Sequence, residues 1–417
     1  MKLSSPNAYA RAEESLITGI NKHAHILFLL AATGFALLAR TSMLPIESGD
    51  YTNFLYPWYT KLAEEGFSSF KERFHNYSLL YMYLLYFLTL LKVPALYGIK
   101  AVSILGDFLL AYFAAKAVLH CTNNKLRAIL CYALVILCPT VIINGAAWAQ
   151  CDSLYTGSIV ASLYYLLQER HKPALFWYAI AFCFKLQALF LFPVYLSLAL
   201  CRAFPAYYIF WGFGLYLLIH LPALLVGARI RFVFWETYRI QLTRHKHDLS
   251  ANAPSLWVYV SNKSKYLNNA APFMGLGMVL AGSFICHVTG AVRKNLLTAM
   301  TFFAVFVPFV LPRMHERYFF VADILCIIYA CYRPQRFFIP CLVVLSSLIA
   351  CGTFISASPM IPHTMNAILM ALAVAILGVD LWNDYHNDKE IIDAKEFCPT
   401  EVTDYSLCVK TKNRCTK

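Results

Sequence analysis

Long runs of apolar residues separated by short polar loops constrain the fold of this chain more than any other feature. Of its 417 residues, 60% are hydrophobic and only 14% are charged, whereas soluble domains carry about 25% charged residues. A helix needs about 20 apolar residues to cross the hydrocarbon core of a bilayer. The pattern predicts an all-α polytopic membrane protein with about 12 transmembrane helices, at roughly 25–43, 98–118, 128–145, 153–167, 173–184, 188–200, 206–225, 270–289, 296–311, 318–332, 337–355 and 364–380.

Positive charges in the short loops orient these segments. If the N-terminus is cytoplasmic, every short cytoplasmic loop is basic, as the positive-inside rule requires. The residues concerned are Lys125, Arg127, Arg170, Lys172, Arg202, Arg293, Lys294, Arg333 and Arg336. This orientation requires that residues 78–91 do not cross the membrane. As a helix this segment extends only about 21 Å, against a core of about 30 Å, so we expect a half-embedded helix on the external face.

The chain then divides into five parts. They are a cytoplasmic N-terminus (1–24), a transmembrane module (25–225) whose external loop 45–97 contains amphipathic helices, a second long external loop (226–269), C-terminal transmembrane helices (270–383) and a cytoplasmic tail (384–417). The first apolar run has no small-residue cleavage site behind it and is predicted to be a retained anchor. The 14 cysteines are scattered without paired spacing, which is typical of small buried hydrophobic residues rather than of disulfides or metal ligands.

Polar residues gather in the loops that this topology places outside. Glu47 and Asp50 directly follow the first apolar segment, and an aromatic-rich stretch containing Trp58 comes next. Such a carboxylate is either a solvated interfacial group or, where aromatic neighbours exclude water, a general base that takes a proton from a hydroxyl. In the turn between the third and fourth segments, Trp148, Gln150 and Asp152 alternate. They are either ordinary interfacial residues or a platform for the apolar face and hydroxyls of a sugar.

Two further clusters carry positive charge. Lys185 and Gln187 interrupt an apolar run, which predicts a broken or re-entrant helix pair around a polar site. The segment Arg313-Met314-His315-Glu316-Arg317-Tyr318 separates two apolar runs. It is either a set of boundary charges or a docking site for an anion such as phosphate. Cations near one membrane face, with carboxylates opposite, indicate a site for an anionic, lipid-borne molecule. The basic loop 227–269 either binds anionic head groups or forms a lid that turns Trp257 inward.

These clusters, in this order, resemble the GT-C glycosyltransferases that take a sugar from a polyprenyl-phosphate carrier. The matching elements are Asp50 followed by Trp58, the segment Asn76-Tyr77-Ser78-Leu79-Leu80, the turn from Pro139 to Gln150, the pair Lys185 and Gln187 followed by Pro193, and the run His315–Tyr318. The prolines of the family's first-loop element are missing, and there is no Asp-x-Asp motif. In size the chain is most similar to bacterial serotype-converting glucosyltransferases that modify O-antigen.

The resemblance implies a direct inverting displacement at the anomeric carbon, with Asp50 as general base and no metal or other cofactor. It implies that the donor phosphate is bound by Arg313, His315, Arg317 and Lys185. It implies that the sugar and acceptor are bound by Glu47, Trp58, Trp148, Gln150, Asp152, Gln187, Glu316 and Tyr318. Glu316 could instead tether Arg313.

The implied partners are a polyprenyl-phosphate hexose, glucose in the first place, a glycan acceptor such as O-antigen or a related envelope polysaccharide, and membrane lipids, but no nucleic acid. The implied location is the bacterial inner membrane, with the site facing the periplasm. Two other functions share the same features. A polysaccharide polymerase or ligase would rely mainly on arginines in two long loops, and a transporter or flippase for lipid-linked sugars would show repeated halves. The polar clusters gather at one face of the membrane and include Asp50, and both features favour the transferase.

Overall fold

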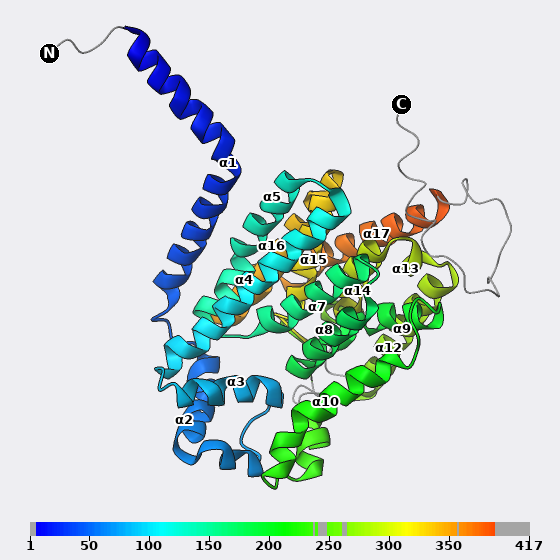
Figure 1. Cartoon of the computed structure of the whole chain (residues 1–417). Coiled ribbons are helices and arrows are strands. Elements are labelled where there is room, and N and C mark those ends of the chain that lie inside the picture. Colours follow the sequence, from blue (N-terminus) through cyan, green and yellow to red (C-terminus); the bar gives the residue numbers. More distant parts are fainter. Residues whose placement is uncertain (1–5, 237, 241–247, 261–264, 357, 388–417) are drawn as a thin grey trace.

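The computed structural model describes residues 6–236, 238–240, 248–260, 265–356 and 358–387, which form an elongated helical bundle (Figure 1). The first half contains α1 (Pro6–Met43), α2 (Tyr56–Glu65), α3 (Leu79–Leu90), α4 (Ala95–Thr122), α5 (Lys125–Ile136), α6 (Pro139–Ile142), α7 (Asp152–Leu167), α8 (His171–Phe184), α9 (Phe192–Leu200) and α10 (Tyr208–Leu225). The second half contains α12 (Lys265–Val288), α13 (Ala291–Lys294), α14 (Leu296–Val310), α15 (Phe320–Tyr332), α16 (Phe338–Ser356) and α17 (His363–Asn387).

Short irregular helices and one small ladder complete the described chain. The π-helical turns are η1 (Tyr51–Leu55), η3 (Ile143–Ala147) and η5 (Phe232–Glu236), and the 3-10 turns are η2 (Gly66–Lys71), η4 (Leu186–Leu191), η6 (Leu256–Tyr259) and η7 (Pro334–Arg336). Strands β1 (Ser250–Ala251) and β2 (Met314–His315) pair in parallel, which joins the second long loop to the 313–318 segment.

Several of the described helices have the length and composition of membrane spans. Six qualify, or seven if α5 and the bent continuation through α6 and η3 form one span. The six are Lys22–Met43, Ala95–Thr122, Tyr208–Leu225, Lys265–Val288, Pro334–Ser356 and His363–Asp384. The protein is therefore an all-α chain with several candidate spans. The other predicted segments are also helical but short, since α7 has 16 residues, α8 14, α14 15 and α15 13. The count of 12 stays a prediction.

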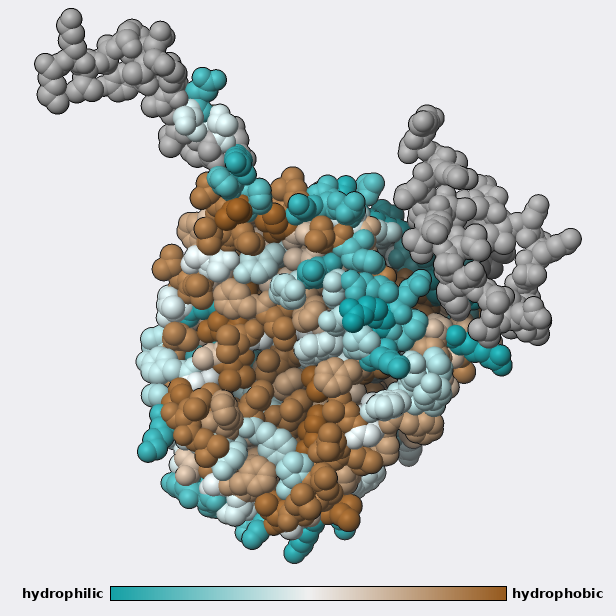
Figure 2. Space-filling view, in the orientation of Figure 1, coloured by the Kyte–Doolittle hydropathy of each residue, from teal (hydrophilic) through white to brown (hydrophobic). Residues whose placement is uncertain are grey.

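The centre of the bundle is formed by α4, α7 and α8 in the first half and by α14 and α15 in the second (Figure 1). Helix α4 packs closely on α7 because glycines remove side chains at the contact. A Cβ on Gly106 would lie 3.0 Å from Leu154 Cδ2, and one on Gly157 would lie 3.4 Å from Leu110 N. Small residues at such contacts let helices gain van der Waals packing, which drives their association in membranes. Figure 2 shows hydrophobic side chains over much of the visible face.

A buried ion pair fixes α1 against this centre. Arg40 of α1 donates from Nε to Asp107 Oδ2 of α4 at 2.9 Å, and the two side chains are 1% and 0% exposed. Ser153, near the start of α7, donates to Asp107 Oδ1. Breaking a buried pair leaves an uncompensated charge, so this contact fixes the positions of α1, α4 and the start of α7 relative to one another. The loop that follows α1 and the residue that precedes Ser153 both belong to the polar site described next.

The cysteine prediction holds for most of the described positions. Cys131, Cys138, Cys183, Cys286 and Cys326 are buried and free, whereas Cys201 and Cys331 are half-buried. Cys398, Cys408 and Cys415 lie outside the described residues.

Candidate active site

Two contacts hold the loop after α1, which carries Asp50. The ammonium group of Lys100, on α4, donates to the carbonyl oxygens of Met43, Leu44 and Ile46 at 2.9, 2.9 and 2.6 Å. These carbonyls at the C-terminal end of a helix carry partial negative charge, which a cation stabilises. The Lys100 side chain therefore fixes where the chain leaves α1.

Ser48, which lies three residues before η1, provides the second contact. Its Oγ accepts a hydrogen bond from the Tyr51 backbone N–H at 3.1 Å and donates to the Trp148 carbonyl at 2.7 Å. A serine at the start of a helical turn satisfies a backbone donor that would otherwise have no partner. The same hydroxyl links the first external loop to the turn that contains Trp148 and Gln150.

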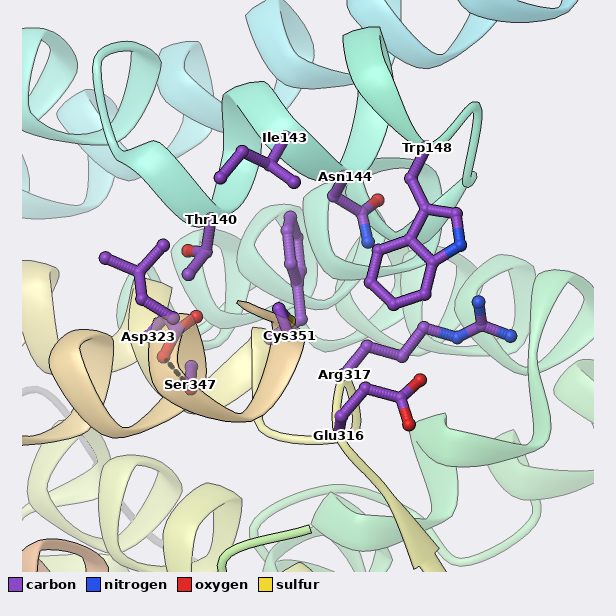
Figure 3. A pocket seen from close by; sticks show the side chains of 11 residues that line it. Thr140, Ile143, Asn144, Trp148, Glu316, Arg317, Asp323, Ser347 and Cys351 are labelled. Carbon is purple, nitrogen blue, oxygen red and sulfur yellow. Dashed lines mark hydrogen bonds between the residues drawn. The ribbon is translucent and has the colours of Figure 1, made fainter. Parts of the chain in front are cut away.

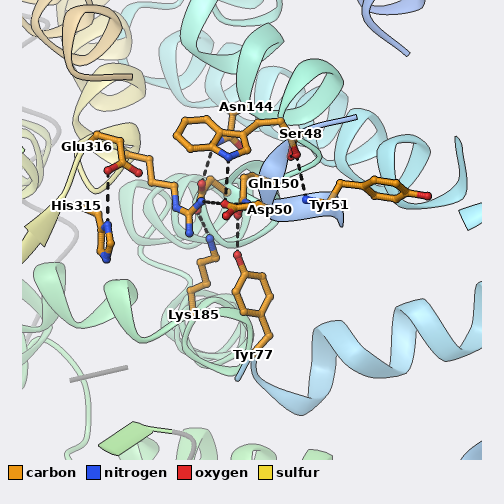
Figure 4. A network of polar contacts seen from close by, with 12 residues as sticks. Ser48, Asp50, Tyr51, Tyr77, Asn144, Gln150, Lys185, His315 and Glu316 are labelled. Carbon is orange, nitrogen blue, oxygen red and sulfur yellow. Dashed lines mark hydrogen bonds and ion pairs between the residues drawn. The ribbon is translucent and has the colours of Figure 1, made fainter. Parts of the chain in front are cut away.

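The carboxylate of Asp50 accepts three hydrogen bonds, all on Oδ2 (Figure 4). Trp148 Nε1 donates at 3.0 Å, Gln150 Nε2 at 2.7 Å and Arg317 Nη1 at 2.9 Å. The donors come from positions up to 267 residues away in the sequence. Three donors on one oxygen hold the carboxylate in one orientation. Within the described residues the other oxygen, Oδ1, has no donor, and the side chain keeps 21% exposure.

Gln150 is itself held by Tyr77. The Tyr77 hydroxyl donates to Gln150 Oε1 at 2.6 Å, which leaves the amide N–H2 of this buried side chain directed at Asp50. Burial raises the pKa of Tyr77 to about 12, against the opposing effect of Lys185 and Arg317. The hydroxyl therefore stays protonated and remains a donor at neutral pH. Ala149 has a φ of 62°, a sharp turn that accompanies the change in direction between Trp148 and Gln150.

Lys185 forms a buried ion pair with Asp152. Its ammonium group contacts Asp152 Oδ1, the side chains are 9% and 3% exposed, and Asn144 Nδ2 donates to Asp152 Oδ2 at 2.7 Å. The ammonium also lies 5.2 Å from the centre of the Tyr77 ring. Lys185 has extended backbone between the end of α8 and the start of η4. The helix therefore breaks at the position where the sequence predicted a broken pair.

The 313–318 segment is placed by the second long loop. Arg313 N–H donates to the Leu249 carbonyl at 2.8 Å, next to the β1–β2 ladder. Arg313 adopts a φ of 66°, and its Nη2 donates to the Asn268 carbonyl at 3.2 Å. Its side chain therefore contacts the start of α12, whereas Arg317 contacts Asp50. Trp257 is buried and donates to the Val310 carbonyl at 2.7 Å, so it anchors the loop on the end of α14. Arg244, His245, Lys246 and His247 lie outside the described residues.

A cavity of about 160 Å³ opens beside Asp50. Seven of the predicted site residues line it, namely Asp50, Lys185, Gln187, His315, Glu316, Arg317 and Tyr318. Trp148, Gln150 and Asp152 do not line it but contact Asp50 or Lys185 directly. Three predicted residues lie elsewhere. Arg313 contacts Asn268, Glu47 is exposed and does not line this cavity, and Trp58 packs against Tyr77 at 5.3 Å between ring centres.

This cluster contains carboxylates as well as cations, so the site is not purely cationic. Two cations, Lys185 and Arg317, lie with three carboxylates, Asp50, Asp152 and Glu316, and the His315 Nδ1 atom is 3.5 Å from Glu316 Oε2. Arg317 also lies 5.5 Å from the Trp148 ring centre, a cation–π distance. The arginine is therefore held by a carboxylate on one side and by an aromatic face on another.

A second, much smaller cavity of about 10 Å³ lies behind Trp148 (Figure 3). Among the described residues, four buried atoms of its lining side chains have no hydrogen-bond partner, namely Asn144 Oδ1, Glu316 Oε2, Arg317 Nε and Asp323 Oδ2. A volume of this size is at the lower limit of what one bound water molecule needs. Ser347 donates to Asp323 Oδ1 at 2.7 Å.

Sequence reasoning missed Ser48, Tyr77, Asn144 and Asp323 as site residues. The first three fall in segments already recognised as polar, but Ser, Tyr and Asn are too common at interfaces to single out. Asp323 was detectable as a carboxylate inside the predicted span 318–332.

No protein-family model matches this chain, and no curated protein matches it. Among the residues that the structure describes, no three His, Cys, Asp or Glu side chains come together as metal ligands.

Proposed function

We propose that the chain is an inverting GT-C-type glycosyltransferase with about 12 spans. It moves a hexose, glucose in the first place, from a polyprenyl-phosphate carrier to a glycan acceptor on the external face of the bacterial inner membrane. The observation that supports this most directly is Asp50. Its Oδ2 accepts all three hydrogen bonds, and its Oδ1 accepts none from the described residues. Arg317, one of the donors, lines the same cavity as Asp50.

In the proposed reaction Asp50 acts as the general base. Its Oδ1 removes the proton of an acceptor hydroxyl while that oxygen attacks the anomeric carbon of the donor sugar. The bond between the anomeric carbon and the phosphate oxygen breaks, and its electron pair leaves with the lipid phosphate. Attack opposite the leaving group inverts the configuration, so no enzyme nucleophile or covalent intermediate takes part.

Arg317 is proposed to contact both the base, Asp50, and the leaving phosphate. One of its nitrogens contacts Asp50, and its side chain lines the cavity. Guanidinium N–H groups not used by Asp50 have the fixed, planar geometry that matches phosphate oxygens. Negative charge grows on the phosphate as the sugar leaves, so a preorganised cation there stabilises the transition state more than the bound donor. His315 also lines the cavity, and its imidazole is a second group that can donate a hydrogen bond to the phosphate.

We assign Lys185 a role that differs from the phosphate contact that the resemblance implies. Its ammonium group pairs with Asp152, and both side chains are almost fully buried. In this role Lys185 neutralises the buried Asp152 and packs over the Tyr77 ring, which keeps both side chains in place beside the cavity. Contact with the donor phosphate would require this pair to exchange partners, which costs desolvation of Asp152.

Transfer from synthetic polyprenyl-phosphate sugars to an envelope glycan extract tests the proposal. Purified protein in vesicles is incubated with glucosyl, galactosyl and mannosyl donors, and the glycan product and the released lipid phosphate are measured together. The proposal expects one donor to give equal amounts of both. Movement of intact donor across the vesicle membrane without release would support a transporter, and joining of lipid-linked glycans without use of a monosaccharide donor would support a polymerase or ligase.

A further inference from the structure

A large apolar groove runs along the outside of the bundle between α8 and α10, away from the Asp50 cavity. Its volume is about 760 Å³, and its lining includes Phe176, Trp211, Gly214 and Leu218, with Lys172 at one end. Helix α10 has the composition of a membrane span, and the Trp211 side chain is 74% exposed. The groove is therefore open to whatever surrounds the helices, which for a spanning helix is lipid.

The two helices run in the same direction along this groove. Lys172 lies over the Tyr208 ring at 5.8 Å, and further along Phe182 contacts Tyr216 with ring centres 5.4 Å apart. The polar end of the groove is thus at the start of both helices. Lys185 follows directly on the last residue of α8. Since α8 has 14 residues, its two ends are about 20 Å apart. Lys172 therefore lies at the opposite end of α8 from the Asp50 cavity, which Lys185 lines.

Positive charge surrounds the Lys172 end. Arg170 and Lys172 lie at the start of α8, and Arg202 lies in the turn that leads to α10. This turn packs against α8, because the His171 and Phe204 rings are 5.8 Å apart. Glu169 is the carboxylate next to them in sequence. The N-terminal backbone N–H groups of α8 add further partial positive charge at this end.

We propose that this groove binds a phospholipid with an anionic head group, with its phosphate at Lys172 and its acyl chains along Phe176, Trp211 and Leu218. An apolar, aromatic-lined channel matches acyl chains, and a basic cluster at its interfacial end matches the head group. The occupant is a bilayer lipid and not the sugar carrier, because the carrier's phosphate is required at the other end of α8. The exclusion of the sugar carrier rests on the proposed function, whereas the match of the groove to an anionic lipid rests on its lining and on the basic cluster alone.

Native mass spectrometry of the full chain tests this site. The protein is extracted from vesicles containing equal amounts of phosphatidylglycerol and phosphatidylcholine, and the retained lipids are counted. We expect phosphatidylglycerol to be retained in preference. Lys172→Gln should reduce that preference about fivefold, the effect of one basic residue near a membrane surface.

Two further variants separate the groove from general surface charge. Gly214→Leu fills the groove at a position where an added Cβ meets no atom within 4 Å, so it should fold and should reduce retention of both lipids. Lys116→Gln is the matched control, because Lys116 also lies 5.8 Å from a tyrosine ring, that of Tyr164, but does not line the groove. It should leave retention unchanged. The proposal is wrong if wild type shows no preference, if Lys172→Gln keeps it, or if Gly214→Leu retains lipid as wild type does. It is also wrong if polyprenyl phosphate added to the same vesicles displaces the retained phosphatidylglycerol.

Discussion

Loss of the Lys185 charge should destabilise the protein far more than loss of a surface lysine. In Lys185→Met the apolar stem of the side chain is kept, but Asp152 loses its counter-ion. The Asp152 side chain is 3% exposed, and Asn144 is then its remaining hydrogen-bond donor among the described residues. A carboxylate cannot recover its hydration at such a position. Removal of one partner from a buried pair costs about 3–5 kcal/mol, and we expect a loss of unfolding free energy in this range.

The measurement is equilibrium unfolding in mixed detergent micelles, followed by circular dichroism. Lys61→Met is the control, because Lys61 pairs with Glu65 at 2.8 Å but the two side chains are 25% and 45% exposed. An exposed pair of this kind contributes at most about 1 kcal/mol. The double variant Lys185→Met with Asp152→Asn removes both charges and should recover most of the loss. A Lys185→Met protein as stable as Lys61→Met would refute the buried-pair account.

Three further predictions follow from the structure. Gln150→Leu removes a donor to Asp50 and leaves the half-buried Tyr77 hydroxyl without its acceptor. The unfolding free energy should therefore fall by about 1–3 kcal/mol, and sugar transfer should slow. Unchanged values of both would contradict the network. Lys100→Met removes three hydrogen bonds at the end of α1, and the same unfolding measurement should show a loss of about 3 kcal/mol or more. Burial lowers the pKa of His75 from 6.5 to about 4. The unfolded chain therefore takes up a proton below pH 6.5 while the folded protein does not, so stability present above pH 6.5 should fall by about 3 kcal/mol as the pH drops to 4. His75→Phe should flatten this dependence, and an equal slope in both proteins would rule His75 out as its source.

The helical segments could be predicted from the sequence because apolar run length is a strong signal. Lys185 predicted the end of α8, because a cation inside an apolar run indicates either a break in the helix or a partner of opposite charge. From the loop topology alone, the sequence also predicted that Asp50, Gln150 and Arg317 lie on the same side of the membrane. The structure brings these three together around one oxygen atom.

What could not be predicted was the direction of individual side chains. Arg313 and Arg317 are alike in type and four residues apart, yet the left-handed backbone at Arg313 and its pairing with the second loop turn it toward Asn268. Trp58 was expected to meet the sugar, but it packs against Tyr77 as part of the hydrophobic core. The pairing of Lys185 with Asp152 depends on how α8 packs against α7, because the two residues are 33 positions apart in the sequence. No local pattern encodes such a contact.

The rate of sugar transfer by Asp50→Asn tests the central claim most directly. The asparagine oxygen can accept the hydrogen bonds from Trp148, Gln150 and Arg317, so the substitution changes mainly the second oxygen, the proposed base. Glu47→Gln, three residues earlier and exposed, is the matched control and should transfer at the wild-type rate. We predict that Asp50→Asn binds the polyprenyl-phosphate donor as wild type does but transfers at least about 10²-fold more slowly. Full activity in Asp50→Asn, or a loss of donor binding as large as the loss of transfer, would contradict the assignment of Asp50 as the base.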